Sequence, residues 1–259
     1  MKKNEIRLRQ IVEILLKKHR VQIKELADLF NVSHMTIRRD LEKLAYNDVV
    51  LDVRGLAVFN SRIDPEEMKN NYSLQDAGRF HLKEKERIGA YAASQIDDGD
   101  CIIIDNGTTT EKLAQSIPSH LKITVLTTNL NIVNRLADNP NISLVFGGGY
   151  YHKDTSFFES AESINLINKT RANKVYLSAA GVHQTLGVTC ANSYELDTKY
   201  AFMKSGAEKI LLTDSSKFGL IKKNFFAKLD DLNKIITDHN LTEEWSDFIK
   251  KHNIDLVTV

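Results

Sequence analysis

Residues 32–44 read VSHMTIRRDLEKL, and this stretch decides the fold of the N-terminal part of the chain. Its apolar side chains Ile37, Leu41 and Leu44 are spaced i, i+4 and i+7. That spacing places all three on one side of a helix and predicts an amphipathic helix over about 34–46.

The side of this helix opposite the apolar face carries the residues that could bind DNA. Arg38 and Arg39 point there, and a planar guanidinium can bind guanine O6 and N7, or a phosphate, through two hydrogen bonds. The predicted DNA contacts in and beside the helix are Ser33, His34, Met35, Thr36, Arg38, Arg39 and Lys43.

Two further helices are predicted upstream of this one. Apolar residues recur at helical spacing over about 4–18, and again within QIKELADLF at 22–30. A short turn follows at 31–33, where Ser33 is a good N-cap for the next helix. Two short helices joined by a tight turn, the second of them basic, predict a helix-turn-helix whose second helix enters the major groove.

A β-hairpin wing is predicted downstream, at residues 49–59, VVLDVRGLAVF. Arg54 in this hairpin would contact a phosphate or the minor groove. Residues 1–60 hold 12 basic and 8 acidic residues, against 23 and 26 in 61–259, as expected if only the first part meets a polyanion. A structural three-helix bundle with a solvated charged face is the alternative.

From residue 83 onward, short apolar runs alternate with helical patterns. This alternation predicts a mainly parallel sheet covered by helices on both faces. The predicted strands are 101–105, 123–128, 143–147, 174–181, 209–214, 234–237 and 255–259. The predicted helices lie near 84–97, 109–117, 129–138, 158–169, 193–205 and 242–252. Residues 61–82 are read as a polar linker with some helix around 65–76, so the domains are 1–60 and 83–259.

Polar and glycine residues follow several of these strands, at the edge where parallel sheets bind ligands. The first strand ends in DNGTTT (105–110), which predicts an anion cradle of backbone amides, hydroxyls and a helix N-terminus. Other strands end in TTN (127–129), in GGG (147–149) and in DSSK (214–217). Each alone could be an ordinary turn or helix cap.

These motifs resemble the DeoR family of bacterial regulators. The unbroken TIRRDL at 36–41 is similar to the family's helix-turn-helix, although its usual paired glycines in the wing are reduced here to Gly55. D-x-G-T-T, T-T-N, a glycine pair, E-x-x-x-K and D-x-S-K-F-G are similar to its sugar-phosphate sensor domain, which resembles ribose-5-phosphate isomerase. The segment SAAGVHQTLGVTC (178–190) is closest to members whose inducer is deoxyribose-5-phosphate.

The resemblance implies an effector site at the strand ends. Asn106, Gly107, Thr108 and Thr109 match the phosphate loop, and Lys217 the lysine that neutralises the phosphate. The other residues implied are Asp105, Thr128, Asn129, Gly148, His183, Glu195, Lys199 and Asp214. Two alternatives stay open, because Glu195 and Lys199, four residues apart, could simply pair with each other, and His183 could be structural.

The function expected is a cytoplasmic, homo-oligomeric transcriptional repressor that a sugar phosphate releases from its DNA operator. No catalytic residue, metal or cofactor is expected, and Cys101 and Cys190 are read as reduced thiols. No signal peptide or membrane-spanning run is predicted. The alternatives are a sugar-phosphate isomerase or aldolase, or a DNA-architectural protein without a ligand.

Overall fold

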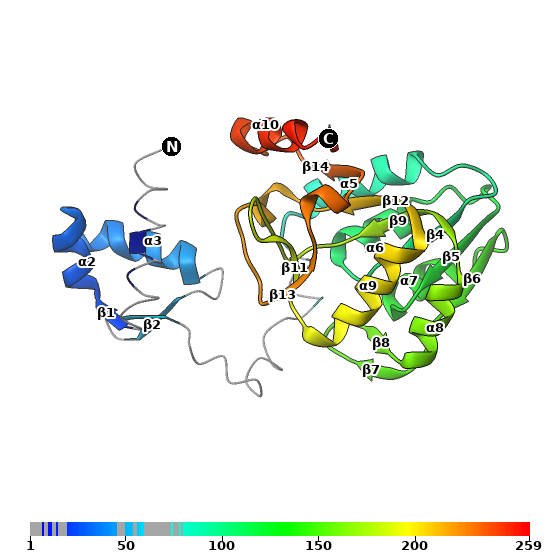
Figure 1. Cartoon of the computed structure of the whole chain (residues 1–259), viewed down its shortest axis with the longest axis horizontal. Helices are drawn as coiled ribbons and strands as arrows, with labels where there is room; N and C mark the ends of the chain where they lie inside the picture. The colour runs from blue at the N-terminus through cyan, green and yellow to red at the C-terminus, as the bar shows by residue number, and fades with distance from the viewer. Residues whose placement is uncertain are drawn as a thin grey trace. The chain divides into compact units, whose positions relative to one another are not determined.

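The chain divides into two compact units, Met1–Asn71 and Tyr72–Val259. Figure 1 presents the computed structural model, which describes residues 7, 10, 11, 14, 20–45, 50–53, 56–59, 74, 78 and 80–259. Within these described residues, no helix is long and apolar enough to cross a membrane. Of the predicted linker helix, only Leu74 lies among the described residues, and it is helical.

The smaller unit combines helices with a three-stranded antiparallel sheet of order β1-β3-β2. Its described elements are β1 (Arg20–Gln22), α2 (Ile23–Phe30), α3 (His34–Ala45), β2 (Val50–Val53) and β3 (Leu56–Phe59). Of the helix predicted over 4–18, residues 7, 10, 11 and 14 are described, and all four are helical. The predicted hairpin is confirmed, but the sequence analysis missed the third strand, β1.

The turn between α2 and α3 forms as the sequence predicts. Helix α2 ends at Phe30, and its C-cap residue Asn31 adopts the left-handed conformation with φ of 50°. Ser33 then caps α3, because its hydroxyl oxygen accepts a hydrogen bond of 3.2 Å from the backbone N–H of Thr36. Ile37 and Leu41 are almost completely buried in the core of this unit, which confirms the predicted apolar face.

The larger unit is built on a seven-stranded, all-parallel sheet of order β15-β14-β12-β9-β4-β5-β6. Its strands are β4 (Cys101–Ile104), β5 (Ile123–Thr127), β6 (Ile142–Phe146), β9 (Ala172–Leu177), β12 (Gly206–Leu212), β14 (Lys234–Thr237) and β15 (Asp255–Thr258). Its helices are α5 (Leu82–Ser94), α6 (Thr108–Ser116), α7 (Leu130–Leu136), α8 (Ala161–Lys169), α9 (Leu196–Ser205) and α10 (Glu243–Lys251). The predicted parallel sheet is therefore confirmed.

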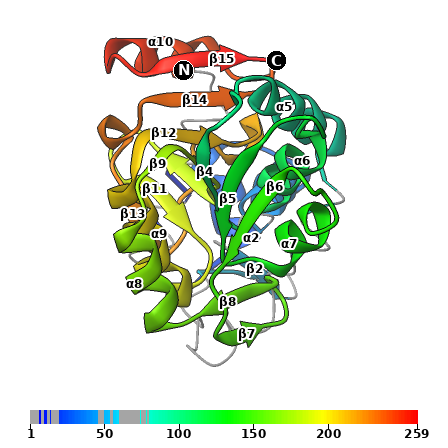
Figure 2. The ribbon, with the colours of Figure 1, turned by 90° about the vertical axis from the view of Figure 1, so that its right-hand side faces the viewer.

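Helices cover both faces of this sheet. Figure 2 shows α5, α6 and α7 on one side and α8 and α9 on the other. Two apolar cores result, because β-branched strand residues point alternately to the two faces. Ile102 and Ile104 belong to the core under α5 and α6, while Ile103 belongs to the core under α8, α9 and α10.

Two small antiparallel sheets, which the sequence analysis missed, surround the carboxyl ends of the parallel strands. One is the hairpin β7 (Tyr150–His152) and β8 (Phe157–Glu159), and the other joins β10 (Gly181–His183), β11 (Gly187–Cys190) and β13 (Asn224–Ala227). Two expected boundaries were consequently wrong. The strand predicted to reach residue 181 ends at Leu177, and the helix predicted from residue 158 begins at Ala161, because β8 pairs with β7.

Helices α5 and α6 approach each other backbone to backbone at Gly89. A Cβ atom at Gly89 would lie 2.5 Å from the carbonyl carbon of Lys112, well inside van der Waals contact. Glycine is therefore required here by packing rather than by a special backbone angle, and the contact fixes how α5 lies along α6.

Substituting Gly89→Ala should lower the free energy of unfolding by about 1–3 kcal/mol, because α5 and α6 must move apart to admit the methyl group. Urea unfolding of the full chain measures this. Gly148→Ala is the matched control, since a Cβ there would meet nothing within 4 Å. Equal urea midpoints for the two variants would contradict the packing argument.

Candidate functional site

Helix α3 presents the predicted DNA-contacting residues on its exposed side. Met35 is 59% exposed, and Arg38 and Arg39 are also exposed, whereas Ile37 on the opposite side is buried. Ser33 and His34 are exposed as well, and Thr36 is half-buried. Lys43 lies within α3, and Arg54 lies outside the described residues. The described arginines thus stand on an open surface of a capped helix, as groove reading requires.

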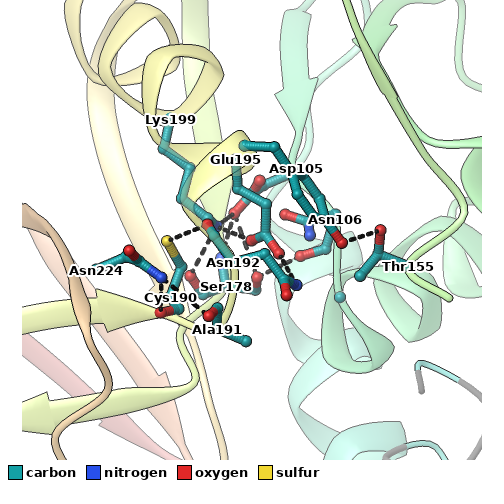
Figure 3. Close-up of polar contacts among 12 residues, drawn as sticks. Asp105, Asn106, Thr155, Ser178, Cys190, Ala191, Asn192, Glu195, Lys199 and Asn224 are labelled. Atoms are coloured by element: carbon teal, nitrogen blue, oxygen red, sulfur yellow. Dashed lines mark hydrogen bonds and ion pairs between the residues drawn. The ribbon is translucent and has the colours of Figure 1, made fainter. Parts of the chain in front are cut away.

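Beyond the ends of β4 and β9 lies a buried charge cluster formed by Asp105, Glu195 and Lys199, shown in Figure 3. All three residues are at most 3% exposed. The Lys199 ammonium lies 2.5 Å from Asp105 Oδ2 and 4.0 Å from Glu195 Oε2. The pair expected from the four-residue spacing is thus present, but the tighter partner of Lys199 is Asp105, which lies 94 residues away in the chain.

Several hydrogen bonds tie the buried charge cluster to its surroundings. Asp105 Oδ2 also accepts from the backbone N–H of Ser178, at 2.9 Å, and from the Ser178 hydroxyl. The amide of Asn192 donates to Glu195 Oε1 at 2.7 Å. The first residue after β4, the first residue after β9 and the start of α9 are therefore held together by these contacts.

The charges and the burial of the cluster shift the pKa values of Lys199 and Glu195. Burial alone would lower the pKa of Lys199, but the carboxylates of Asp105 and Glu195 outweigh it, so the pKa is raised. For Glu195, burial raises the pKa despite the opposing influence of Lys199 and Asn192. Lys199 is consequently an ammonium at neutral pH, and an ammonium cannot act as a nucleophile toward a sugar aldehyde.

The anion cradle that the sequence predicts falls on the turn from β4 into α6. Gly107 has φ of 152°, and a Cβ atom there would lie 2.7 Å from Ser178 Cβ, so only glycine fits. Thr110 donates its hydroxyl proton to the Gly107 carbonyl at 3.0 Å. The first N–H groups of a helix have no partner within the helix, so the start of α6 is a potential anion-binding position. Thr108 is half-buried and Thr109 is buried at its start.

Asn106 carries an unsatisfied acceptor beside the cradle. It is only 4% exposed, and its Oδ1 atom has no hydrogen-bond partner within the described chain. A buried amide oxygen without a donor is costly, which makes it a candidate for contact with a hydroxyl group of a ligand.

The loop after β12 supplies the predicted lysine. Asp214 caps a short turn by accepting from the N–H of Ser216 at 3.2 Å. Asp238, at the end of β14, accepts from the N–H and hydroxyl of Ser215 at 2.6 and 2.9 Å. Lys217 ends this turn half-buried, and within the described part of the chain its side chain forms no ion pair.

A second lysine near this loop was not predicted from the sequence. Lys85 on α5 is 3% exposed, and its charge interacts with those of Asp214 and Lys217. A signal existed, because Lys85 falls on the same helix face as Ile88 and Ala92, both of which are buried. A lysine on the apolar face of a helix is unusual enough to mark a candidate site.

The remaining predicted effector residues make contacts within the protein. The Asn129 amide donates to the Thr155 carbonyl at 3.3 Å, and Thr128 beside it is fully buried. The Gly148 carbonyl accepts from the hydroxyls of Ser160 and Ser163, at 2.8 and 2.7 Å. His183 Nδ1 accepts from the N–H groups of Thr185 and Leu186, both at 3.2 Å, in the turn between β10 and β11. Any role of these residues in ligand binding stays a prediction.

Two family models match the chain in order. Residues 7–63 match the DeoR-like helix-turn-helix domain, and residues 80–239 match the DeoR C-terminal sensor domain. The chain belongs to the DeoR family. This DeoR-family chain is therefore a sugar-responsive, DNA-binding transcriptional regulator and not an enzyme. Its predicted fold, a winged helix-turn-helix followed by a parallel-sheet sensor domain, is confirmed.

Curated relatives of the DeoR-family chain match it over nearly its whole length. The transcriptional regulator IolR of Bacillus subtilis is 31% identical, covering 97% of this chain and 98% of its own. The deoxyribose operon repressor of Escherichia coli is 28% identical, covering 98% of both chains. A solved structure, ribose 5-phosphate isomerase A from Methanocaldococcus jannaschii, matches 54% of each chain with 16% identity and a TM-score of 0.39.

In the described part of the chain, no group of three or more histidine, cysteine or acidic side chains could hold a metal ion. Cys101 and Cys190 are both free thiols. Burial raises the pKa of Cys190 to about 12, so this thiol stays protonated and unreactive at neutral pH.

Substituting Lys199→Met should lower the free energy of unfolding by about 3–5 kcal/mol, because two carboxylates would stay buried without their cation. Urea unfolding measures this effect. Lys217→Met is the matched control, since that half-buried lysine forms no ion pair within the described chain. Adding Asp105→Asn to Lys199→Met should restore part of the loss, and a single-variant loss below about 1 kcal/mol would argue against a structural role.

Proposed function

We propose that the chain is a cytoplasmic, homo-oligomeric repressor of a sugar or deoxyribonucleoside catabolic operon, released from its operator by deoxyribose 5-phosphate. The observation that carries the effector proposal is Asn106, whose buried Oδ1 has no hydrogen-bond partner among the described residues and which lies directly before the start of α6, where the first-turn amides have no partner within the helix. Amide donors suit a phosphate group, and an acceptor suits a sugar hydroxyl.

Two features support a phosphorylated effector. The dipole of α6 and its free N–H groups favour an anion at this turn. Lys217, without an ion-pair partner in the described residues, adds a cation in a short polar turn. A neutral sugar would leave the N-terminus of α6 and the Lys217 ammonium without an anion, whereas a phosphate ester would interact with both of these groups.

The sugar itself is proposed from the segments 178–190, 195–199 and 214–219, which resemble the deoxyribose operon repressor. A different pentose or hexose phosphate is the alternative. The relatives leave it open, because IolR and the deoxyribose operon repressor have nearly equal identity to this chain, 31% and 28%. The same binding experiment therefore has to compare several sugar phosphates.

Repression and release require two coupled sites. The recognition helix would read operator half-sites through Met35, Thr36, Arg38 and Arg39, and pairs of half-sites call for at least a dimer. The effector must bind more tightly to an arrangement that does not match the half-site spacing. Release by about 100-fold needs a coupling free energy of roughly 3 kcal/mol between the two sites.

Substituting Arg39→Ala should weaken operator binding by about 1–3 kcal/mol, because a bidentate contact to a base or phosphate is lost. A gel-shift titration at fixed salt concentration measures this. Arg87→Ala is the control, since it removes an equal charge from an exposed position on α5 in the other unit. Unchanged operator affinity of the Arg39 variant would remove this arginine from the interface.

Deoxyribose 5-phosphate should raise the melting temperature of the full chain, because a ligand that binds only the native state stabilises it. A ligand at about 100 times its Kd adds roughly 2.7 kcal/mol. Deoxyribose without phosphate should give no shift, and Lys217→Ala should lose the shift while keeping operator affinity. A shift with a hexose phosphate but none with deoxyribose 5-phosphate would reassign the effector.

A further inference from the structure

Strand β6 forms one edge of the seven-stranded sheet, and no strand of the described chain pairs with its outer side (Figure 2). Its register with β5 decides where its backbone groups point. Gly147, directly after β6, donates its N–H to the Thr127 carbonyl of β5 at 3.0 Å. Because backbone groups of alternate residues point to opposite sides of a strand, Val145 also faces β5. Leu144 and Phe146 therefore direct their N–H and C=O groups toward the open edge.

Strand β6 has none of the features that keep an edge strand from pairing further. Natural edge strands are commonly protected by charged residues, by proline or by a bulge. Residues 141–151, NISLVFGGGYY, contain no charged residue and no proline, and the pairing with β5 is regular from 142 to 146. The opposite edge strand, β15, begins with the exposed Asp255, which forms an ion pair of 3.2 Å with Lys234. Only the β6 edge is thus free of charge.

An aromatic cluster lies next to this edge. Phe146 at the end of β6 is 36% exposed, and Tyr151 on β7 is 40% exposed. Both rings contact the ring of Phe158 on β8, with centroid distances of 5.1 and 4.9 Å. Contiguous exposed apolar side chains are typical of interaction surfaces. Unpaired backbone groups and exposed aromatic rings therefore occur together at the same edge of the sheet.

We propose that β6 pairs antiparallel with β6 of a second copy of this chain, so that two seven-stranded sheets join into one. This inference rests on the homo-oligomeric part of the proposed function and names the surface that would form the oligomer. An uncharged strand can lie against its own copy without like charges facing each other. Antiparallel pairing of identical strands is two-fold symmetric and closes at a dimer, as paired operator half-sites require.

The register of this pairing follows from the residues that face outward. With the two-fold axis at Val145, Leu144 lies opposite Phe146 of the second copy, and each such pair exchanges two backbone hydrogen bonds. Val145 then lies opposite its own copy in a non-hydrogen-bonded pair, with Cα atoms about 4.5 Å apart. An axis at Leu144 would instead place Phe146 opposite Ile142. The N–H of Ile142 already donates to the Asn139 carbonyl at 3.1 Å, so that register forms fewer hydrogen bonds.

Disulfide cross-linking of the full chain tests this register. A disulfide needs Cα atoms about 4.4–6.8 Å apart, so diamide should convert most of Val145→Cys into a covalent dimer on a non-reducing gel. Ser143→Cys is the matched control, because its exposed thiol would lie opposite residue 147 of the second copy and about 13 Å from its own copy. Wild type, with the free thiols Cys101 and Cys190, gives the background.

Light scattering coupled to size-exclusion chromatography tests the same edge without a cross-link. Phe146→Lys should weaken dimerisation at least tenfold, because it places a charge opposite Leu144 of the second copy. Leu186→Lys is the control, since it introduces the same charge at a residue that is 50% exposed in the turn between β10 and β11. This control variant should keep the molar mass of wild type.

The outcomes separate the interface from the proposed function. If wild type is a dimer or larger but Val145→Cys cross-links no more than Ser143→Cys, the β6 interface is wrong and the proposed function stands. If wild type is a monomer at micromolar concentrations, the homo-oligomeric part of the proposed function fails and the interface with it. Dissociation by Leu186→Lys but not by Phe146→Lys also overturns the proposal. If Phe146→Lys does not fold, the cross-linking result decides.

Discussion

The buried ion pair between Lys199 and Asp105 is the contact on which the candidate effector site depends. It joins the residue after β4 to α9, and through Ser178 it also involves the residue after β9. The carboxylate group that receives these bonds is adjacent to Asn106 and Gly107, the residues that turn the chain into α6. The turn into α6 therefore follows directly after a residue that is held by a charge pair hidden from solvent. A ligand at the cradle would meet a preorganised surface, and it would gain affinity because little order has to be created on binding.

The hairpin formed by β7 and β8 makes contacts with two other parts of the larger unit. On one side the Thr155 hydroxyl lies 3.1 Å from the hydroxyl of Tyr194, the residue before Glu195. On the other side the backbone N–H of Leu74 donates to the Asp154 carbonyl at 2.8 Å. The hairpin loop therefore contacts both the turn before α9 and the start of the larger unit.

The sequence predicts those elements whose apolar residues recur at a regular spacing. The helix faces around Ile37 and the β-branched strands follow from spacing alone, and the structure confirms them. The strands of three or four residues in β10, β11 and β13 escape because they are too short for a period to be visible. The pairing of Lys199 with Asp105 escapes for another reason: only the fold brings residues 94 positions apart into contact. Lys85 is visible in the sequence as a charged residue on the otherwise apolar face of α5. It was not singled out, because a helix is predicted from the apolar residues on that face and not from the one exception.

The hydrogen-bond acceptors near the start of α6 determine which hydroxyl groups of a ligand can be bound there. Asp105 Oδ2 already accepts from Lys199 and Ser178, and Glu195 Oε1 accepts from Asn192, so these two oxygens are engaged within the protein. Asn106 Oδ1 is buried without a donor, so a ligand that supplies a hydroxyl there removes an existing penalty. Every further buried hydroxyl would need an acceptor of its own, and leaving one unmatched costs about 1–3 kcal/mol. Such a cost applies to any sugar in proportion to the hydroxyl groups that it buries without a partner.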